Sequence, residues 1–312
     1  MRIIFMGTPD FAEKSLEAIY NSKHEIIAVV TNPDRPKGRG MKMVASPVKE
    51  FALSKNLPIY QPEKIRKNEE FINTIKALKP DVICVVAYGK ILPKEILEIP
   101  KLGCINVHGS LLPQYRGAAP IQWAIINGDR ITGVTTMYMD VGMDSGDMIL
   151  KEETEIGVDE TTGELWDRLA EIGAKLLVKT LKQIEAGTAP RIKQGEEFTI
   201  APMLEKEMSK INWKEKSAKE IKNLVRGLNP IMGTYSFFDG KKIKIWKVEV
   251  LPEENYDIEN GTVIKADAKE GLYIKAKEGI ISVLEIQGEN AKRMNIKDFL
   301  RGNQIKVGSM FE

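Results

Sequence analysis

Residues 81–109, DVICVVAYGKILPKEILEIPKLGCINVHG, decide the fold class of this 312-residue chain. The run VICVVAY within them is apolar throughout, as is IIAVV at 26–30. Strands with one solvated face alternate apolar and polar residues, so both runs indicate strands that are covered on both faces. Outward from them, short β-like runs alternate with helical segments, which is typical of parallel strands joined by right-handed crossovers. We predict an α/β fold with a Rossmann-like, open and mostly parallel sheet.

The first half of the chain ends in one long helix. The expected strands before it are RIIFM, EIIAVVT, DVICVVAYG, GCINV and TGVTTMYM, and the expected helices are 10–21, 46–55, 67–78 and 117–127. A helix is predicted from Thr161 or Thr162 to about Ala186, with apolar residues at helical spacing and Gly187 ending it. Residues 188–206 contain two prolines and no sustained periodicity, which indicates a linker that crosses the surface.

The remainder of the chain is predominantly β-like. Ser217 and Glu220 have the spacing of a capping box at the start of a helix. Five β-like runs follow, separated by glycine-rich turns: TYSFFD, KIKIWKVEVL, GTVIKA, GLYIKA and GIISVLEIQ. Five short strands with one helix fit a small β-barrel; the oligonucleotide-binding barrel is the obvious candidate, although other five-stranded barrels share the pattern. We predict domains at 1–187 and 207–312, with the linker at 188–206 between them.

Charge and cysteine content bound the class of protein. The net charge is only +2, but residues 210–247 hold ten Lys or Arg against three acids, an excess that attracts phosphate-rich partners or merely solvates a surface. The only cysteines, Cys84 and Cys104, fall in apolar runs and are expected to be buried and reduced. With two histidines in the chain, no zinc site is expected. No secretory signal or membrane span is predicted, which favours a cytoplasmic protein.

Asn106 and His108 are the first candidate site residues. They lie two apart in a predicted strand, so their side chains project to the same side while Val107 points the other way. Gly109 and Ser110 then turn the chain where the strand ends, at the edge where open α/β sheets bind ligands. The alternative is a solvated strand end with a hydrogen-bonded histidine.

A third group comes from the glycine-punctuated loop after the strand TGVTTMYM. It offers three carboxylates: Asp140, Asp144 and Asp147. If the two strands neighbour each other, their ends meet and one Asp reaches the amide and the imidazole. No Ser or Cys nucleophile stands beside the base, so direct acyl transfer fits better than a covalent intermediate. The amide and imidazole can stabilise an oxyanion while the carboxylate orients the imidazole and relays protons. The Ser110 hydroxyl could help, or it could cap the turn.

Residues 32–49 form a basic segment between an expected strand and helix. Its cations are Arg35, Lys37, Arg39 and Lys42, which lie among prolines and glycines. This composition is typical of a long, mobile loop. Phosphate contacts and a merely solvated basic loop are both open on the residues alone.

These motifs together resemble the folate-dependent formyltransferases. The likeness rests on N-V-H-G-S-L-L-P-x-x-R-G at 106–117, followed at this spacing by M-D-x-G-M-D-S-G-D at 139–147. The stretches IIFMGTPDFA, NPDRPKGRGMK and VVAYGKILP extend it, as does the basic C-terminal part, so that it covers essentially the whole chain.

The resemblance implies both an activity and a site. The activity is transfer of a formyl group from 10-formyltetrahydrofolate to the α-amino group of methionine esterified to initiator tRNA, by direct attack through a tetrahedral intermediate, without a metal. The implied catalytic trio is Asn106, His108 and Asp144, and the implied folate-contacting turn is Ser110, Leu111, Leu112 and Pro113. The implied tRNA-contacting loop is 32–49, with Arg39 in the position of an important arginine. The implied C-terminal domain is an oligonucleotide-binding-type barrel, and no membrane or obligate protein partner is expected.

Other functions are weighed on particular features. The same folate chemistry could serve glycinamide ribonucleotide, an amino-sugar nucleotide or water, but a small acceptor needs no basic surface at 210–247. A tRNA-binding module without catalysis would need none of the trio. Gly7-Thr8-Pro9 stands where a dinucleotide fingerprint would, yet G-x-G-x-x-G is missing, so we reject a nicotinamide cofactor.

Overall fold

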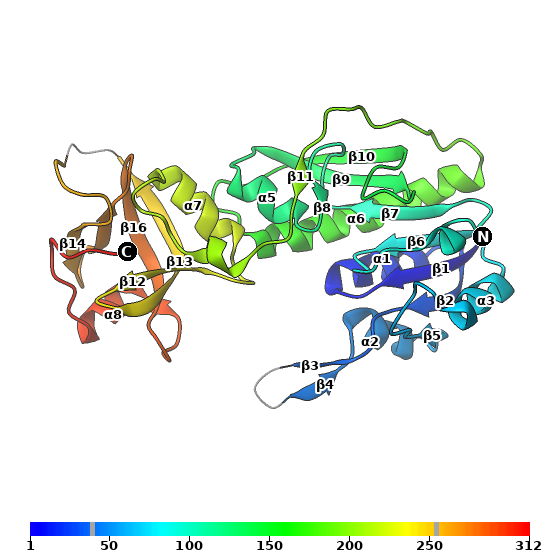
Figure 1. The fold of residues 1–312 in the computed structure, drawn as a ribbon, viewed down its shortest axis with the longest axis horizontal. Coiled ribbons are helices and arrows are strands. Elements are labelled where there is room, and N and C mark those ends of the chain that lie inside the picture. The colour runs from blue at the N-terminus through cyan, green and yellow to red at the C-terminus, as the bar shows by residue number, and fades with distance from the viewer. Residues whose placement is uncertain (38–40, 253–255) are drawn as a thin grey trace. The chain divides into compact units, whose positions relative to one another are not determined.

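The computed structural model describes residues 1–37, 41–252 and 256–312, and its contacts group the chain into two compact units (Figure 1). Unit 1 comprises Met1–Pro120, Ile131–Glu155 and Trp166–Ala201, and unit 2 comprises Ile121–Arg130, Ile156–Leu165 and Pro202–Glu312. Two short segments of the first half thus group with the C-terminal part, whereas most of the expected linker groups with unit 1. The domain boundaries at 187 and 207 remain predictions.

A seven-stranded sheet of order β10-β9-β7-β6-β1-β2-β5 runs through unit 1. Its strands are β1 (Arg2–Gly7), β2 (Glu25–Val30), β5 (Ile59–Tyr60), β6 (Val82–Val86), β7 (Cys104–His108), β9 (Ile131–Tyr138) and β10 (Met148–Glu155). The strands from β5 to β7 in this order pair in parallel, whereas β9 runs antiparallel to both β7 and β10. The predicted open, mostly parallel sheet is confirmed, with an antiparallel edge.

Helices cover both faces of this sheet, as the apolar strand runs predicted. The helices of unit 1 are α1 (Asp10–Tyr20), α2 (Pro47–Ser54), α3 (Glu69–Leu78), α4 (Lys94–Leu97) and most of α6 (Thr162–Glu185), whereas α5 (Pro120–Ile126) groups mainly with unit 2. On one face, Ile83 and Val85 of β6 pack in an apolar cluster that includes residues of α3 and α4. On the other face, Gly173 of α6 lies so close to Val107 that a Cβ there would be 2.9 Å from its Cγ1. Every residue of β6 is consequently buried.

Two short strand pairs complete unit 1. Strands β3 (Arg35–Lys37) and β4 (Lys42–Val44) form an antiparallel pair within the basic segment. Strand β11 (Ile200–Ala201), in the expected linker, pairs in parallel with β8 (Arg116–Gly117). These strands are only two or three residues long, so they left no periodic signal in the sequence. No helix in the described ranges is both long and apolar enough to cross a membrane.

Unit 2 holds an antiparallel sheet of order β12-β13-β16-β15-β14, with β17 also paired to β16. Its elements are a 3-10 helix (Lys206–Ser209), α7 (Ala218–Gly227), β12 (Thr234–Phe238), β13 (Lys241–Leu251), β14 (Val263–Asp267), β15 (Gly271–Lys275), β16 (Ile280–Gln287), β17 (Met294–Asn295) and α8 (Ile296–Gly302). The predicted capping box at Ser217 and Glu220 is present at the start of α7. All five predicted β-like runs of this part form strands.

The C-terminal residues link the two edge strands of the sheet in unit 2. Phe237 of β12 exchanges two backbone hydrogen bonds of 2.8 Å with Glu312, and Val263 of β14 donates a 2.8 Å bond to the carbonyl of Ser309. The last few residues therefore pair with both edge strands of this sheet, β12 and β14. That the sheet forms a barrel of the oligonucleotide-binding type remains a prediction.

Candidate active site

Asn106 and His108 project from the same face of β7, as the two-residue spacing predicted. Val107, between them, points to α6 on the opposite face. His108 pairs in register with Thr135 of the neighbouring β9. The imidazole is buried, with 6% of its side chain exposed, while Asn106 is half-buried. The strand therefore presents an amide and an imidazole together at its carboxyl end.

The turn after β7 is fixed by hydrogen bonds from Ser110 and Thr135. The Ser110 hydroxyl donates to the carbonyl of Gln114 at 2.6 Å. Thr135 Oγ1 donates to the Ser110 carbonyl at 2.7 Å and accepts from the Leu112 amide at 3.1 Å. Ser110 is thus used within the turn, which was one of its two predicted roles, and the Leu112–Pro113 peptide bond is cis.

Asp144 is the carboxylate that reaches these residues. Its Oδ1 lies 3.5 Å from Asn106 Nδ2 and 3.7 Å from His108 Nδ1, and its Oδ2 accepts a 2.9 Å hydrogen bond from the Gly117 amide. The other two candidate carboxylates, Asp140 and Asp147, contact other groups. Asp140 accepts hydrogen bonds from Gly142 and Ser145 within its own loop, and Asp147 pairs with Arg191 at 3.4 Å.

The route by which Asp144 arrives differs from the prediction. We expected the carboxyl ends of β7 and β9 to meet, but the two strands are antiparallel, and Tyr138 at the end of β9 lies opposite Ile105 near the start of β7. The expectation was wrong because it assumed parallel neighbours. The loop 139–147 instead folds back along β7, and Asp144 adopts a left-handed backbone conformation, with φ of 50°.

The hydrogen bonds of His108 identify the nitrogen that can exchange a proton. Its Nε2 lies 2.8 Å from the Tyr115 carbonyl oxygen. A carbonyl oxygen can only accept, so Nε2 carries the hydrogen. Nδ1, which faces Asp144, is therefore the nitrogen that gains or loses a proton. The site combines an amide donor, an imidazole and a carboxylate, and suits proton handling beside a developing oxyanion.

Three residues that contact this site were missed by the sequence reasoning. Gln194 donates to the carbonyls of Asp144 and Gly146, at 2.7 and 2.9 Å, and Thr199 accepts from the Tyr115 amide at 2.8 Å. Arg116 donates to Gln194 at 2.9 Å. Arg116 stands within the motif at 106–117 and could have been singled out. Nothing in the sequence distinguished the other two, because they lie in a stretch without periodicity.

Within the basic segment, the strands β3 and β4 pair in antiparallel fashion. Arg35 on β3 and Lys42 on β4 are exposed, and Lys37 pairs through its backbone with Lys42. Arg39 lies outside the described residues. Asp34 and Lys49 form an ion pair of 2.7 Å where the segment joins α2, and it holds the pKa of Asp34 below its usual range through the hydrogen bond from Lys49. The assignment of these cations to tRNA remains a prediction.

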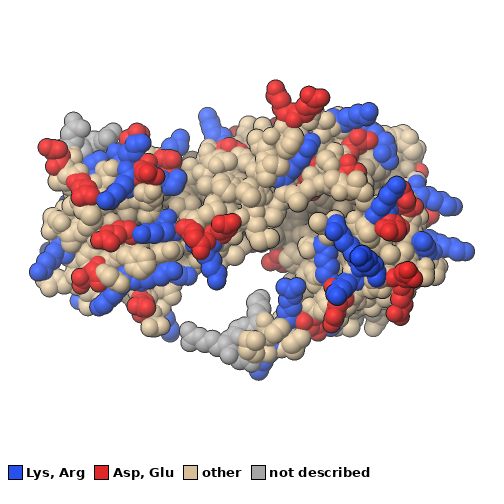
Figure 2. Space-filling model, viewed as in Figure 1, with Lys and Arg blue, Asp and Glu red and all other residues tan. Residues whose placement is uncertain are grey.

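A basic–aromatic face lies on the outer side of β12 and β13 in unit 2. Tyr235 and Phe237 pair in register with Lys244 and Lys242, and Trp246 follows on β13. Cations lie over the rings: Lys242 Nζ is 3.6 Å from the Tyr235 centroid, Lys210 is 5.4 Å from Phe237, and Lys244 and Arg293 are each 5.1 Å from Trp246. Figure 2 shows Lys and Arg interspersed with Asp and Glu over the visible surface.

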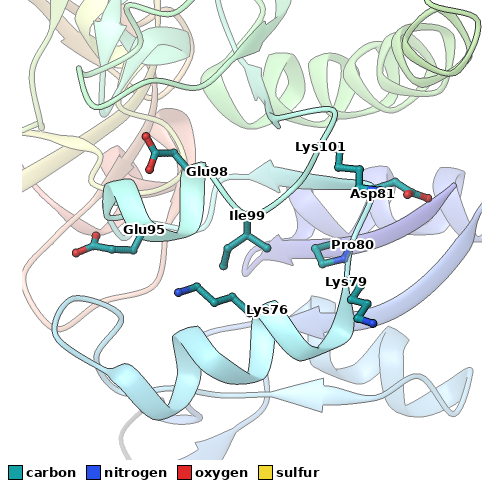
Figure 3. A pocket seen from close by; sticks show the side chains of 8 residues that line it. All are labelled: Lys76, Lys79, Pro80, Asp81, Glu95, Glu98, Ile99 and Lys101. Atoms are coloured by element: carbon teal, nitrogen blue, oxygen red, sulfur yellow. The ribbon is translucent and has the colours of Figure 1, made fainter.

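A charged pocket of about 490 Å³ lies elsewhere in unit 1 (Figure 3). Its lining side chains are Lys76, Lys79, Pro80, Asp81, Glu95, Glu98, Ile99 and Lys101. Asp81 immediately precedes β6, so the pocket sits at the amino ends of the parallel strands. The trio lies at the opposite edge, beyond the carboxyl end of β7, so the pocket is no part of the site. In the described part of the chain, no group of three His, Cys, Asp or Glu side chains could hold a metal ion.

Comparison with known proteins identifies the families and relatives that this chain resembles. The formyl transferase family model matches residues 1–181, and the model of the formyl transferase C-terminal domain matches residues 203–304. A methionyl-tRNA formyltransferase of Acetivibrio thermocellus is 51% identical over 311 residues, covering 99% of each chain. One from Clostridioides difficile is 52% identical over 309 residues, again covering 99% of each chain.

Solved structures share the fold at low sequence identity. An N-formyltransferase of Helicobacter canadensis, in complex with folinic acid and dTDP-3-aminofucose, has a TM-score of 0.64 at 21% identity and covers 90% of this chain and 98% of its own. HypX of Aquifex aeolicus, in complex with tetrahydrofolic acid, has a TM-score of 0.62 at 17% identity and covers 99% of this chain and 50% of its own.

Proposed function

The chain belongs to the formyl transferase family, and on that premise we propose that it transfers a formyl group from 10-formyltetrahydrofolate to the α-amino group of methionine carried by initiator tRNA. Relatives about half identical along their full length carry the name of this activity. The product, formylmethionyl-tRNA, initiates translation, and a cytoplasmic location is part of the proposal.

The observation that carries the proposal is the position of Asp144 within reach of both Asn106 and His108. As the amine attacks the formyl carbon, the formyl oxygen gains negative charge, which a positioned N–H stabilises. The Asn106 amide contacts Asp144 at 3.5 Å, the limit of a hydrogen bond, so its N–H groups remain available for that oxygen. His108 Nδ1 and Asp144 together take up the proton that the amine releases.

The residues present fit the formyl donor through their chemistry. The folate supplies the activated formyl group, and the half-buried Asn106 beside a buried imidazole provides the donor set that a formyl oxygen needs. In the turn after β7, the side chains of Ser110 and Leu112 are fully buried, whereas Leu111 and Pro113 are half-buried. We therefore expect Leu111 and Pro113 to be the side chains of the turn that touch the folate, and Ser110 and Leu112 to hold its shape.

The acceptor is assigned from surfaces outside the trio. We expect the basic–aromatic face of unit 2 to contact tRNA, because cations bind phosphates and aromatic rings, here half-buried, can stack on bases. We expect Arg35, Lys37, Arg39 and Lys42 of the basic segment to contact the same RNA. A small acceptor such as an amino-sugar nucleotide would use neither surface.

One assay tests the proposal against its alternatives. The purified chain is supplied with 10-formyltetrahydrofolate and, in parallel, with methionyl-initiator tRNA, an amino-sugar nucleotide and glycinamide ribonucleotide. Formylation of the tRNA at a kcat/KM at least a thousandfold above that of the other acceptors is the expected result. Preferential formylation of either small acceptor, or binding of tRNA without turnover, would overturn it.

A further inference from the structure

The sequence indicated a linker at residues 191–201, but this segment contacts the rest of unit 1 at three successive points. Its partners are the loop that holds Asp144, residues 139–147, and residues 115–117, which follow the turn after β7. At the first point, Ile192 and Met148 exchange backbone hydrogen bonds of 2.8 and 2.9 Å. Arg191 lies 3.7 Å over the ring of Tyr138 and pairs with Asp147. These contacts fix both ends of the loop 139–147, because Tyr138 precedes it and Met148 follows it.

Gln194 makes the second point of contact. Both carbonyls that its Nε2 reaches, those of Asp144 and Gly146, belong to the loop, at 2.7 and 2.9 Å. Its Oε1 accepts from Arg116 Nε at 2.9 Å. A side-chain amide has two N–H donors and one carbonyl, so every polar group of Gln194 is engaged. The side chain consequently ties the backbone of Asp144 to the segment that follows the β7 turn.

Thr199 and Ala201 make the third point of contact. Thr199 accepts from the amides of Tyr115 and Arg116, each at 2.8 Å, through its hydroxyl and its carbonyl respectively. Gly117 approaches Ala201 so closely that a Cβ on it would lie 2.6 Å from the Ala201 carbonyl oxygen. The peptide 115–117 is therefore held against residues 199–201.

These tethers act on the partners of the trio. The Tyr115 carbonyl accepts from His108, and the Gly117 amide donates to Asp144. Asp144 itself has a positive φ, a conformation that costs a non-glycine residue energy and persists where surrounding contacts hold it. We propose that residues 191–201 form a strap that positions the trio, with Gln194 as the positioning residue for Asp144. The proposal rests on the formyl transfer proposed above.

The test compares two substitutions to methionine at adjacent residues. Gln194→Met keeps the length of the side chain but removes its three hydrogen bonds, and Lys193→Met alters an exposed neighbour. Formyl transfer is measured with saturating and limiting tRNA, and urea unfolding is followed for both variants. We expect Gln194→Met to lower kcat by about 10- to 100-fold, since misplacement by about 1 Å has effects of this size. The KM for tRNA should stay within twofold of the value for Lys193→Met. The urea midpoint of unfolding should equal that of Lys193→Met within experimental error.

A second variant keeps the test decisive if Gln194→Met does not fold. Gln194→Glu retains the acceptor for Arg116 but turns a carboxylate towards the carbonyls of Asp144 and Gly146. A glutamate beside Arg116 stays ionised near neutral pH, so it can accept from Arg116 but has no proton to donate to either carbonyl. The kcat of this variant should therefore fall by about 10- to 100-fold while its KM for tRNA stays unchanged. A side chain that only supports folding would lower the unfolding midpoint without separating kcat from KM in this way.

The outcomes separate this inference from the proposed function. Wild-type turnover with methionyl-tRNA, together with a Gln194→Met kcat within twofold of Lys193→Met, would overturn the strap and leave the function standing. A Gln194→Glu kcat within twofold of wild type would do the same. Absence of wild-type formyl transfer to any acceptor would instead overturn the proposed function.

Discussion

Asp144 joins the amide and the imidazole of the site, so its negative charge is the property to remove first. Asp144→Asn keeps the size of the side chain and an oxygen for the Gly117 amide, but it removes the carboxylate that faces His108 Nδ1. We expect kcat to fall by about 10²- to 10⁴-fold, the usual range for the loss of general acid–base assistance, with the KM for tRNA nearly unchanged. Steady-state kinetics with methionyl-tRNA measure both. Asp140→Asn, in the same loop, is the control, and equal kcat values for the two variants would remove Asp144 from the chemistry.

The buried residue His24 leads to a prediction of how the stability of the fold depends on pH. Its side chain is 1% exposed, and burial lowers the pKa of its imidazole, helped by the nearby amino group of Met1 and opposed by Glu185. The pKa of a histidine in an unfolded chain is about 6.5. A folded pKa below that value means that the unfolded state binds the extra proton. The His24 contribution to stability is therefore complete above about pH 6.5 and is lost as the pH falls towards the folded pKa.

A non-titrating variant isolates this contribution. Wild type should lose more unfolding free energy than His24→Gln between pH 7 and pH 5, as measured by urea denaturation at each pH. The difference between the two slopes cancels the carboxylates that both proteins share. Parallel slopes would show that His24 has the same proton affinity in both states.

The sequence predicts the role of a single residue only where a structural period or a family motif includes that residue. Asn106 and His108 were placed on one face by strand alternation alone, because the period of two leaves no other arrangement. Spacing could not choose among Asp140, Asp144 and Asp147, because a loop has no period; the family motif singled out Asp144. Gln194 carried no signal at all, since its partners are backbone carbonyls, which every residue type possesses.

At the scale of elements, the pairing of β8 with β11 depends on Gly117. Its φ is 127°, and a Cβ would meet the Ala201 carbonyl at 2.6 Å. Gly117→Ala should cost about 1–3 kcal/mol of stability and should also lower kcat, because the Gly117 amide donates to Asp144. Gly195→Ala is the matched control, since nothing lies within 4 Å of the Cβ it would add. Urea unfolding and turnover are compared, and identical behaviour of the two variants would refute a strict need for glycine at 117.

The sequence predicted where most strands and helices lie along the chain, but it did not predict whether neighbouring strands run parallel or antiparallel. Apolar runs and helical periods located five of the seven sheet strands of unit 1 and its longer helices within a few residues, because burial on a sheet or helix imposes a period. They missed the short β5 and α4 and the edge strand β10, whose residues are largely exposed or half-buried. The antiparallel course of β9 left no mark, since a strand buried in either direction has the same composition. The pairing of the last few residues with both edge strands of unit 2 was equally hidden, because it is made by backbone groups.

At the scale of the whole molecule, we expect recognition of tRNA to depend on the charge of the basic–aromatic face in unit 2. Lys242 and Lys244 stand on the basic–aromatic face with their ammonium groups over Tyr235 and Trp246. Each phosphate contact that is lost lowers the steepness of the salt dependence of binding by about 0.7 to 0.9. The double variant Lys242→Ala/Lys244→Ala should therefore raise the KM for tRNA and reduce the slope of its logarithm against log salt by roughly 1.5. Saturating kcat should change little, because the trio lies in unit 1.

A charge-matched control separates this surface from the general charge of the chain. Lys297→Ala/Lys306→Ala removes two exposed lysines from unit 2 outside the basic–aromatic face, and it leaves the same net charge as the first variant. If long-range attraction alone brings tRNA to the enzyme, the two double variants will share one salt slope. If β12 and β13 bear phosphate contacts, only the Lys242/Lys244 variant will lose slope. KM measured across a series of salt concentrations decides between local contact and general attraction, and equal slopes would remove this face from the tRNA site.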